Sequence, residues 1–149
     1  MNANEIKTAW NTFKKEIAKE IDLDLTGCCY MNKKQIENGT ATITLGLDWS
    51  YDDEIAYYIR QIEYYSSWDG ENKERGERYT REYREKIADQ EARKAAHGTR
   101  EKETRGMVEL ITNSAAFKKL AAAISIQSTS LELGKYSKHI NTYQIRINY

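Results

Sequence analysis

Acidic residues at the start of one aromatic-rich stretch are the first candidates for chemistry. Residues 49 to 68 read WSYDDEIAYYIRQIEYYSSW, with Asp52, Asp53 and Glu54 near the start and Asp48 just before it. Carboxylates bind hard cations, but Ca²⁺ takes about six to eight oxygen ligands, and no EF-hand loop or second acidic cluster supplies the rest. Acidic residues in a first helical turn complement the helix dipole without a metal. We therefore expect a helix start here and no metal site.

Two adjacent cysteines are the candidates for nucleophilic catalysis. Cys28 or Cys29 paired with His139 would make a thiolate nucleophile. However, neighbouring cysteines in an apolar strand are usually buried and inert. The two histidines, His97 and His139, lie in no zinc-binding pattern, and no phosphate-binding or hydrolase motif occurs. We therefore expect no enzyme and no cofactor, with a cysteine-dependent enzyme as the weakest of three alternatives.

The N-terminal half contains a helix pattern followed by strand patterns. Apolar residues spaced by three and four predict an amphipathic helix that ends near residue 21: Ile6, Trp10, Phe13, Ile17 and Ile21. The apolar period then changes to two in LDLTGCCYM and TATITLGLDW. Asn38-Gly39 between these strands predicts a hairpin turn. A two-residue turn would point the two apolar sets to opposite faces, so we predict either a bulge near Gly27 or a longer loop over residues 32 to 39.

The remainder of the chain adds helices and two more strands. Ser50 followed by Asp53 predicts a helix N-terminus, and the helix runs to about Trp68, where Asp69-Gly70 breaks it. Helical spacing returns from residues 107 to 124, with Asn113-Ser114 as a division. Strand patterns cover about 124 to 133 and 142 to 149. This order predicts a single α+β domain over residues 1 to 149. Its antiparallel sheet has about four strands in two hairpins, with helices packed on one face.

Residues 69 to 105 form a charged excursion from this domain. They contain 10 acidic and 11 basic residues in an interspersed pattern, which predicts a solvated helix with i,i+4 ion pairs. The only apolar line is Tyr79, Tyr83 and Ile87, and His97-Gly98 predicts the end of the helix.

The helix over residues 51 to 68 has aromatic residues on two sides. At about 100° per residue, one stripe gathers around Ile55, which predicts a core-facing side: Tyr51, Tyr58, Ile59, Ile62 and Tyr65. Tyr57, Tyr64 and Trp68 fall on the far side.

Three explanations fit the second stripe. The Tyr79/Tyr83/Ile87 line folds back over it, a partner protein or second copy covers it, or its rings stack on single-stranded nucleic acid. The nearby carboxylates repel phosphate and disfavour the last. The residues expected at a partner surface are Tyr57, Arg60, Tyr64, Trp68, Tyr79 and Tyr83.

The charge totals favour a cytoplasmic protein without a membrane span. The 149 residues carry 23 basic and 23 acidic side chains, no run of 18 apolar residues, and no apolar segment near the N-terminus that predicts secretion.

Residues 106 to 149 have a net charge of +3, against −4 over residues 1 to 68. The alternative function is therefore direct binding of single-stranded nucleic acid by the C-terminal strands, with Tyr136 and Tyr143 stacking on bases.

Four features describe the chain as a whole: small size, the lack of catalytic motifs, a helix with aromatic residues on two sides, and the absence of proline. In this overall character the chain is similar to small accessory proteins of phages and mobile elements, including anti-CRISPR and other anti-defence inhibitors. The resemblance rests on no shared motif. It implies a non-catalytic module that sterically blocks a host protein or nucleoprotein complex that processes nucleic acid, such as a Cas effector, alone or as a homodimer.

Overall fold

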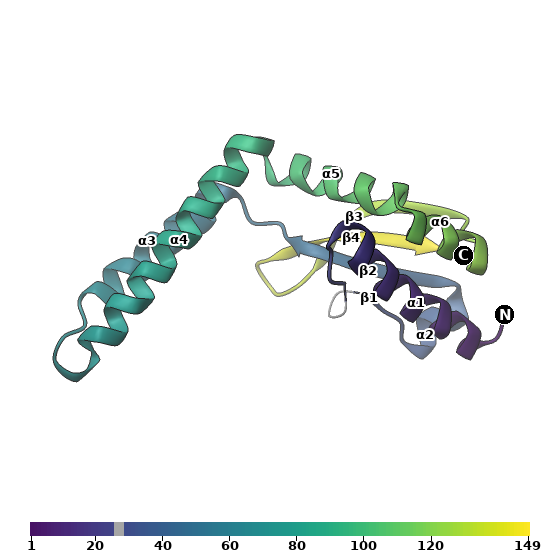
Figure 1. Cartoon of the computed structure of the whole chain (residues 1–149), viewed down its shortest axis with the longest axis horizontal. Helices are drawn as coiled ribbons and strands as arrows, with labels where there is room; N and C mark the ends of the chain where they lie inside the picture. Colours follow the sequence, from purple (N-terminus) through teal and green to yellow (C-terminus); the bar gives the residue numbers. More distant parts are fainter. Residues whose placement is uncertain (26–28) are drawn as a thin grey trace. The chain divides into compact units, whose positions relative to one another are not determined.

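The computed structural model of the chain describes residues 1–25 and 29–149, with the backbone alone for residues 29 and 30. These residues divide into two compact units (Figure 1). Met1–Asp48 and Thr104–Tyr149 form one, which we call the sheet unit, and Trp49–Glu103 form the other, which we call the hairpin unit.

The sheet unit combines helices with one antiparallel sheet. Its helices are α1 (Ala3–Ile21), α2 (Lys33–Asn38), α6 (Ala115–Ile124) and most of α5 (Arg100–Asn113). Its strands are β1 (Cys29–Tyr30), β2 (Thr40–Leu47), β3 (Ser128–Lys135) and β4 (Asn141–Asn148), in the order β1-β2-β4-β3. The predicted α+β class is therefore confirmed.

The predicted count of four full strands in two hairpins was wrong at the first hairpin. Three strands have eight residues each, whereas β1 has two, and a helix rather than a tight turn connects β1 to β2. Asn32 and Gln35 make a reciprocal capping box that starts α2. Gly39, at φ 66°, then ends α2 as its left-handed C-cap. The connection over residues 32 to 39 is thus longer than a two-residue turn, as the register required, and Gly27 lies outside the described residues.

The core of the sheet unit lies between helices and one face of the sheet. The predicted stripe of the first helix is confirmed, since Ile6, Trp10, Phe13 and Ile17 are buried. They pack in one cluster with buried residues of α5, α6 and the strands, among them Ile111, Phe117, Leu120, Ala41, Ile43, Ile145 and Ile147. Burial of an isoleucine side chain contributes about 1.5 to 3 kcal/mol, so this cluster carries much of the unit's stability.

Alternation along the strands leaves the opposite face of the sheet polar. In β4, Ile145 and Ile147 are buried while Arg146 between them is exposed. In β2, Ala41 and Ile43 are buried, and the threonines that alternate with them are partly exposed. One hydrophobic face and one solvated face are typical of an antiparallel sheet covered by helices on one side.

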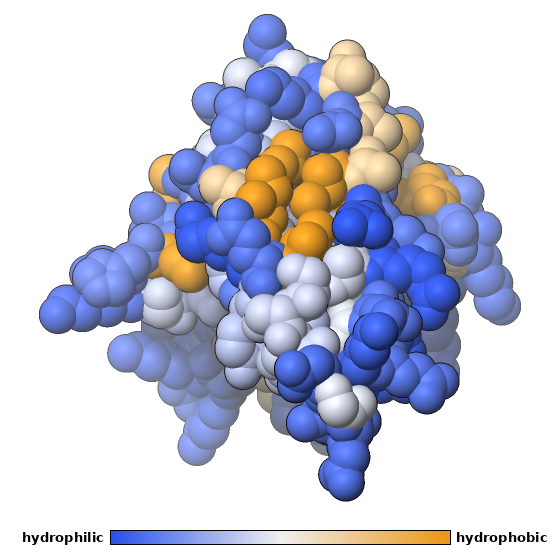
Figure 2. Space-filling view, turned by 90° about the vertical axis from the view of Figure 1, so that its left-hand side faces the viewer, coloured by the Kyte–Doolittle hydropathy of each residue, from blue (hydrophilic) through white to orange (hydrophobic). Residues whose placement is uncertain are grey.

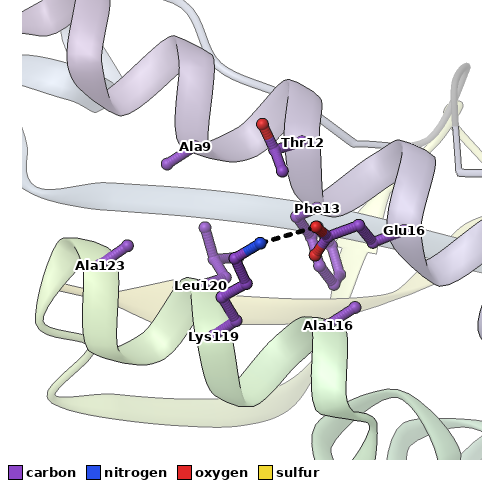
Figure 3. A pocket seen from close by; sticks show the side chains of 8 residues that line it. All are labelled: Ala9, Thr12, Phe13, Glu16, Ala116, Lys119, Leu120 and Ala123. Carbon is purple, nitrogen blue, oxygen red and sulfur yellow. Dashed lines mark hydrogen bonds and ion pairs between the residues drawn. The ribbon is translucent and has the colours of Figure 1, made fainter.

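Helices α1 and α6 are joined by polar contacts at the edge of their packing. The Glu20 carboxylate of α1 accepts hydrogen bonds from the backbone N–H groups of Ala115 and Ala116, at 2.8 and 2.9 Å, and so caps α6. Further along, Lys119 Nζ lies 2.7 Å from Glu16 Oε1 (Figure 3). Ser114 also caps α6, which confirms the predicted division at Asn113-Ser114.

The hairpin unit is built from two helices joined by a short turn. α3 (Tyr51–Ser66) begins at Ser50, whose Oγ accepts from Asp53 N, as predicted. A turn with the short 3₁₀ helix η1 (Gly70–Asn72) leads into α4 (Lys73–His97), which ends at Gly98 as predicted. The unit begins at Trp49 rather than at residue 69, because α3 packs along α4.

Candidate functional site

An aromatic seam joins the two long helices of the hairpin unit. Tyr65 of α3 stacks on Tyr83 of α4 with ring centroids 5.8 Å apart and planes 13° apart. Tyr58 lies 5.6 Å from Tyr83, and Tyr65 lies 4.9 Å from Tyr79. The predicted apolar line of α4 therefore folds back onto α3. It covers the Tyr58/Tyr65 stripe rather than the Tyr57/Tyr64/Trp68 stripe, which corrects the predicted fold-back.

Gly76 allows α4 to approach the C-terminal end of α3 closely. A Cβ atom at this position would lie 2.5 Å from the carbonyl oxygen of Tyr65 and 3.0 Å from Trp68 Cβ. Trp68 consequently joins the seam, 4.9 Å from Tyr65 and 6.2 Å from Tyr79. The helical wheel misplaced Trp68, because α3 ends at Ser66 and the 100° step no longer applies beyond it.

The outer side of α3 keeps two exposed residues of the predicted partner surface. Tyr64 is 57% exposed, and Arg60, one helical turn before it, is exposed. Ile59 on the same helix is 46% exposed, so its predicted place in the core-facing stripe was wrong. Tyr57 is half-buried beside Trp49, at 5.6 Å. Hydrophilic residues (blue) cover most of the face in Figure 2, where apolar residues (orange) gather near the centre beside pale ones. We call Ile59, Arg60 and Tyr64 the α3 outer patch.

Cations on α4 flank the seam. Lys86 Nζ lies 5.0 Å from the ring centroid of Tyr83, and the guanidinium carbon of Arg78 lies 5.2 Å from that of Tyr79. Such cation–π contacts add attraction where the charge stays partly solvated. Of the six predicted partner residues, Tyr79, Tyr83 and Trp68 thus hold the hairpin together, and Tyr57 is half-buried. Arg60 and Tyr64 are exposed, although the Tyr64 ring also packs edge-on against Tyr65 and Trp68, at 5.0 and 5.7 Å.

A polar network, absent from the sequence-based expectations, ties the other end of the hairpin unit. Arg100 donates to Glu54 and to Gln90, both at 2.7 Å, and to the backbone oxygen of Trp49 at 3.0 Å. Its guanidinium also lies 4.2 Å from the centroid of the Tyr51 ring. Only 11% of the Arg100 side chain is exposed. A buried guanidinium with such partners organises the chain around it.

Glu103 is the second centre of this network. It accepts from the Tyr51 hydroxyl and from Arg93, whose Nη2 lies 2.6 Å away. Burial acts to raise the pKa of Glu103, but these hydrogen bonds and the charges of Arg93 and Arg100 outweigh it, so the pKa is lowered. Burial, together with the bond to Glu103, raises the pKa of Tyr51 to about 12. Neither group titrates near neutral pH, so the network suits structure better than proton transfer.

Two of the three acidic residues in the first turn of α3 have partners within the chain. Asp52 Oδ1 lies 2.7 Å from Lys94 Nζ, and Glu54 binds Arg100 and accepts from the Tyr58 hydroxyl at 2.7 Å. In the described part of the chain, no three His, Cys, Asp or Glu side chains gather in a group suited to a metal ion.

The remaining candidates for chemistry are distributed as follows. Cys28 lies outside the described residues, and of Cys29 the structure gives only the strand position; His139 is exposed. Tyr143 is buried and donates to Asp48 Oδ1 at 3.0 Å, so the predicted base stacking by Tyr143 was wrong, whereas Tyr136 is 67% exposed.

A cavity of about 280 Å³ lies between α1 and α6 (Figure 3). It is lined mainly by alanines and other apolar residues, and its two charged residues, Glu16 and Lys119, pair with each other.

Comparisons with protein-family models, with curated proteins and with solved structures found no match to this chain. None of the helices among the described residues combines the length and hydropathy that crossing a membrane requires.

Proposed function

We propose that the protein is a non-catalytic binding module that docks on a protein partner through the α3 outer patch. The observation that carries the proposal is the exposure of Ile59 and Tyr64, at 46% and 57%, on a helix whose other side already packs on α4. Large apolar and aromatic side chains next to an arginine are the composition that protein interfaces favour.

The charge of the hairpin unit favours a protein over nucleic acid. Residues 49 to 103 contain 14 acidic and 11 basic side chains, and the exposed Glu63 adjoins Tyr64. Phosphate binding draws its affinity from an excess of Lys and Arg, which this unit lacks. A protein surface of mixed charge has no such requirement.

The inner structure of the hairpin unit supports a docking role. The aromatic seam and the Arg100 network hold α3 against α4 before any partner arrives. A surface that is already ordered loses less side-chain and backbone entropy on binding, and so keeps more of its contact energy as affinity.

The partner class follows from the resemblance to anti-defence inhibitors. We propose a host nucleic-acid-processing complex, such as a Cas effector, as the partner, and steric occlusion as the mechanism. The binding surface and the identity of the partner are separate claims, because the patch can bind another protein in the same way.

The test compares two exposed tyrosines in the two units. The partner is first isolated on the intact protein and purified, and dissociation constants are then measured for Tyr64→Ala and Tyr136→Ala. Tyr64→Ala should cost about 2 kcal/mol, roughly a thirtyfold loss of affinity, as at an interface hot spot. Tyr136→Ala should leave the affinity unchanged. Both variants should remain folded at the temperature of the binding measurement, although Tyr64→Ala also removes ring contacts with Tyr65 and Trp68. Unchanged binding by Tyr64→Ala would refute the patch.

A second candidate function is nucleic-acid binding by the sheet unit. Tyr136 is 67% exposed between Lys135 and Lys138, and this unit carries 12 basic and 9 acidic side chains. Binding through this region requires that the affinity for single-stranded DNA or RNA fall steeply with salt. It also requires that Tyr136→Ala weaken binding, because stacking on one base is worth about 1 to 3 kcal/mol.

A further inference from the structure

The outer edge of β3 is open. β3 pairs with β4 over all eight residues, from Ser128 opposite Asn148 to Lys135 opposite Asn141, and stands at the end of the sheet order. Among the residues that the structure describes, no strand pairs with its other edge. Because alternate residues of a strand direct their N–H and C=O groups to opposite neighbours, about half of these groups in β3 point away from the sheet.

This edge lacks the usual protection against pairing. Edge strands are commonly shortened, bulged or interrupted by proline. β1, at the opposite edge, has only two residues, whereas β3 has eight, no proline, and a continuous register with β4. The bulge of the sheet lies between Thr44 and Gly46, on β2. The carboxylate of Glu132 lies 3.8 Å from Arg146 of β4, so its charge is partly neutralised by the neighbouring strand.

An apolar row runs toward this edge on the helix-covered face. Leu131 lies opposite Ile145 and Leu133 lies opposite Tyr143, so both leucines share the face of the core. Leu133 is nevertheless 54% exposed. Extension of the sheet by another strand would cover it.

We propose that β3 pairs antiparallel with β3 of a second copy of this chain, which makes one continuous sheet across a two-fold axis. Residues opposite each other in an antiparallel pair share a face of the sheet. The leucines of both copies therefore lie on the same face only when one residue of β3 lies opposite the same residue of the second copy, at the two-fold axis. Centring on Glu132 would oppose two like charges, which is unfavourable. Centring on Leu133 would pair only residues 131 to 135.

Centring on Leu131 satisfies both requirements. It pairs residues 128 to 134 of each copy, with Leu131 opposite Leu131, Leu133 opposite Thr129, and Glu132 opposite Ser130. Four leucines then form one row on the helix-covered face. This contact uses the sheet unit alone, so it is independent of the α3 outer patch.

The oligomeric state of the full chain tests the proposal. Sedimentation equilibrium should show a monomer–dimer equilibrium that Leu133→Lys weakens about tenfold or more, because two-fold symmetry counts each lost contact twice. Leu110→Lys is the matched control, since Leu110 is 62% exposed on α5 and should leave the equilibrium unchanged. Circular dichroism should be the same for all three proteins. A monomer at every attainable concentration, or a dimer that Leu133→Lys does not weaken, would overturn the proposal.

Crosslinking tests the register. Residues opposite each other in an antiparallel pair lie close enough for a disulfide. Under mild oxidation, Leu131→Cys should give a dimer crosslinked through the introduced cysteines, identified by peptide mass spectrometry, whereas Glu132→Cys should not. The reverse pattern would contradict the register centred on Leu131.

Discussion

The two units of this protein are stabilised by different means. In the sheet unit, isoleucines of α1, β2, α5 and β4 reach complete burial around one apolar cluster. In the hairpin unit, Tyr51 is the one large apolar side chain that is fully buried among the described residues, and stacked aromatics with paired charges hold α3 to α4. The comparison shows that a short helical hairpin can be ordered with little apolar core, provided its aromatic rings and ions are matched in space.

The largest expected effect separates buried from exposed isoleucine. Ile145→Ala in the sheet unit should lower the free energy of unfolding by about 2 to 5 kcal/mol, because the side chain is fully buried and a cavity remains. Ile59→Ala in the hairpin unit should change it by less than about 0.5 kcal/mol. Urea unfolding measures both. Equal losses would mean that the apolar contribution does not differ between the units.

The next effect tests the Arg100 network. Arg100→Ala removes the guanidinium that donates to Glu54 and Gln90 and should cost about 3 kcal/mol, as removal of one member of a buried ion pair does. Lys94→Ala breaks the exposed Lys94–Asp52 pair and should cost no more than about 1 kcal/mol. If the two variants unfold at the same urea concentration, the network is not a main support of the hairpin unit.

Two helical glycines sharpen the comparison of packing. Gly76→Ala places a Cβ against the backbone of Tyr65 and should cost about 1 to 3 kcal/mol through overpacking. Gly106→Ala meets nothing within 4 Å and should stabilise α5 by about 0.5 to 1 kcal/mol through helix propensity. Thermal unfolding of both variants measures whether the two substitutions change stability in opposite directions. A stable Gly76→Ala variant would show that α3 and α4 need no close approach.

A double-mutant cycle measures the aromatic seam directly. Tyr65→Ala and Tyr83→Ala should not be additive, with a coupling energy of about 0.5 to 1.5 kcal/mol, because their rings stack. The pair Tyr64→Ala and Tyr83→Ala should show weaker coupling, because Tyr64 is linked to Tyr83 only through Tyr65, whose ring lies 5.0 Å from that of Tyr64. Stronger coupling in the second pair than in the first would mean that α4 covers the Tyr57/Tyr64 side of α3, as the helical wheel first suggested.

The smallest effect is a change in acid sensitivity. The pKa of Glu103 is lowered in the folded protein, so its stabilising contribution is complete above the unfolded value, near 4.5, and is lost as pH falls through the lower folded value. Glu103→Gln should therefore flatten the loss of stability below about pH 4.5. Glu109→Gln, an exposed site on the same helix, should keep the slope of the intact protein. Unfolding curves over this pH range decide between them.

Local patterns predicted much of the sheet unit and the start of the hairpin unit. The stripe from Ile6 to Ile17, the alternation around Ile145, the capping serine Ser50 and the division at Ser114 were all readable, because each depends on residues within a few positions. The prediction of a tight turn in the first hairpin was wrong for a related reason. Asn38-Gly39 suits a hairpin turn and a helix C-cap equally well, since both need a glycine in the left-handed region, and the Asn32/Gln35 capping box that favours the helix was overlooked.

The sequence by itself determined the amphipathic helices, the strand faces and the Tyr58/Tyr65 stripe on the inner side of α3. Only the tertiary structure decided which stripe α4 covers, where Trp68 lies beyond the end of α3, and which of many alternating charges form the Arg100 network. The physical reason is separation along the chain. Arg100 meets Glu54 across 46 positions, and Glu20 meets Ala116 across 96. Such contacts depend on the packing of whole helices, which no local period encodes.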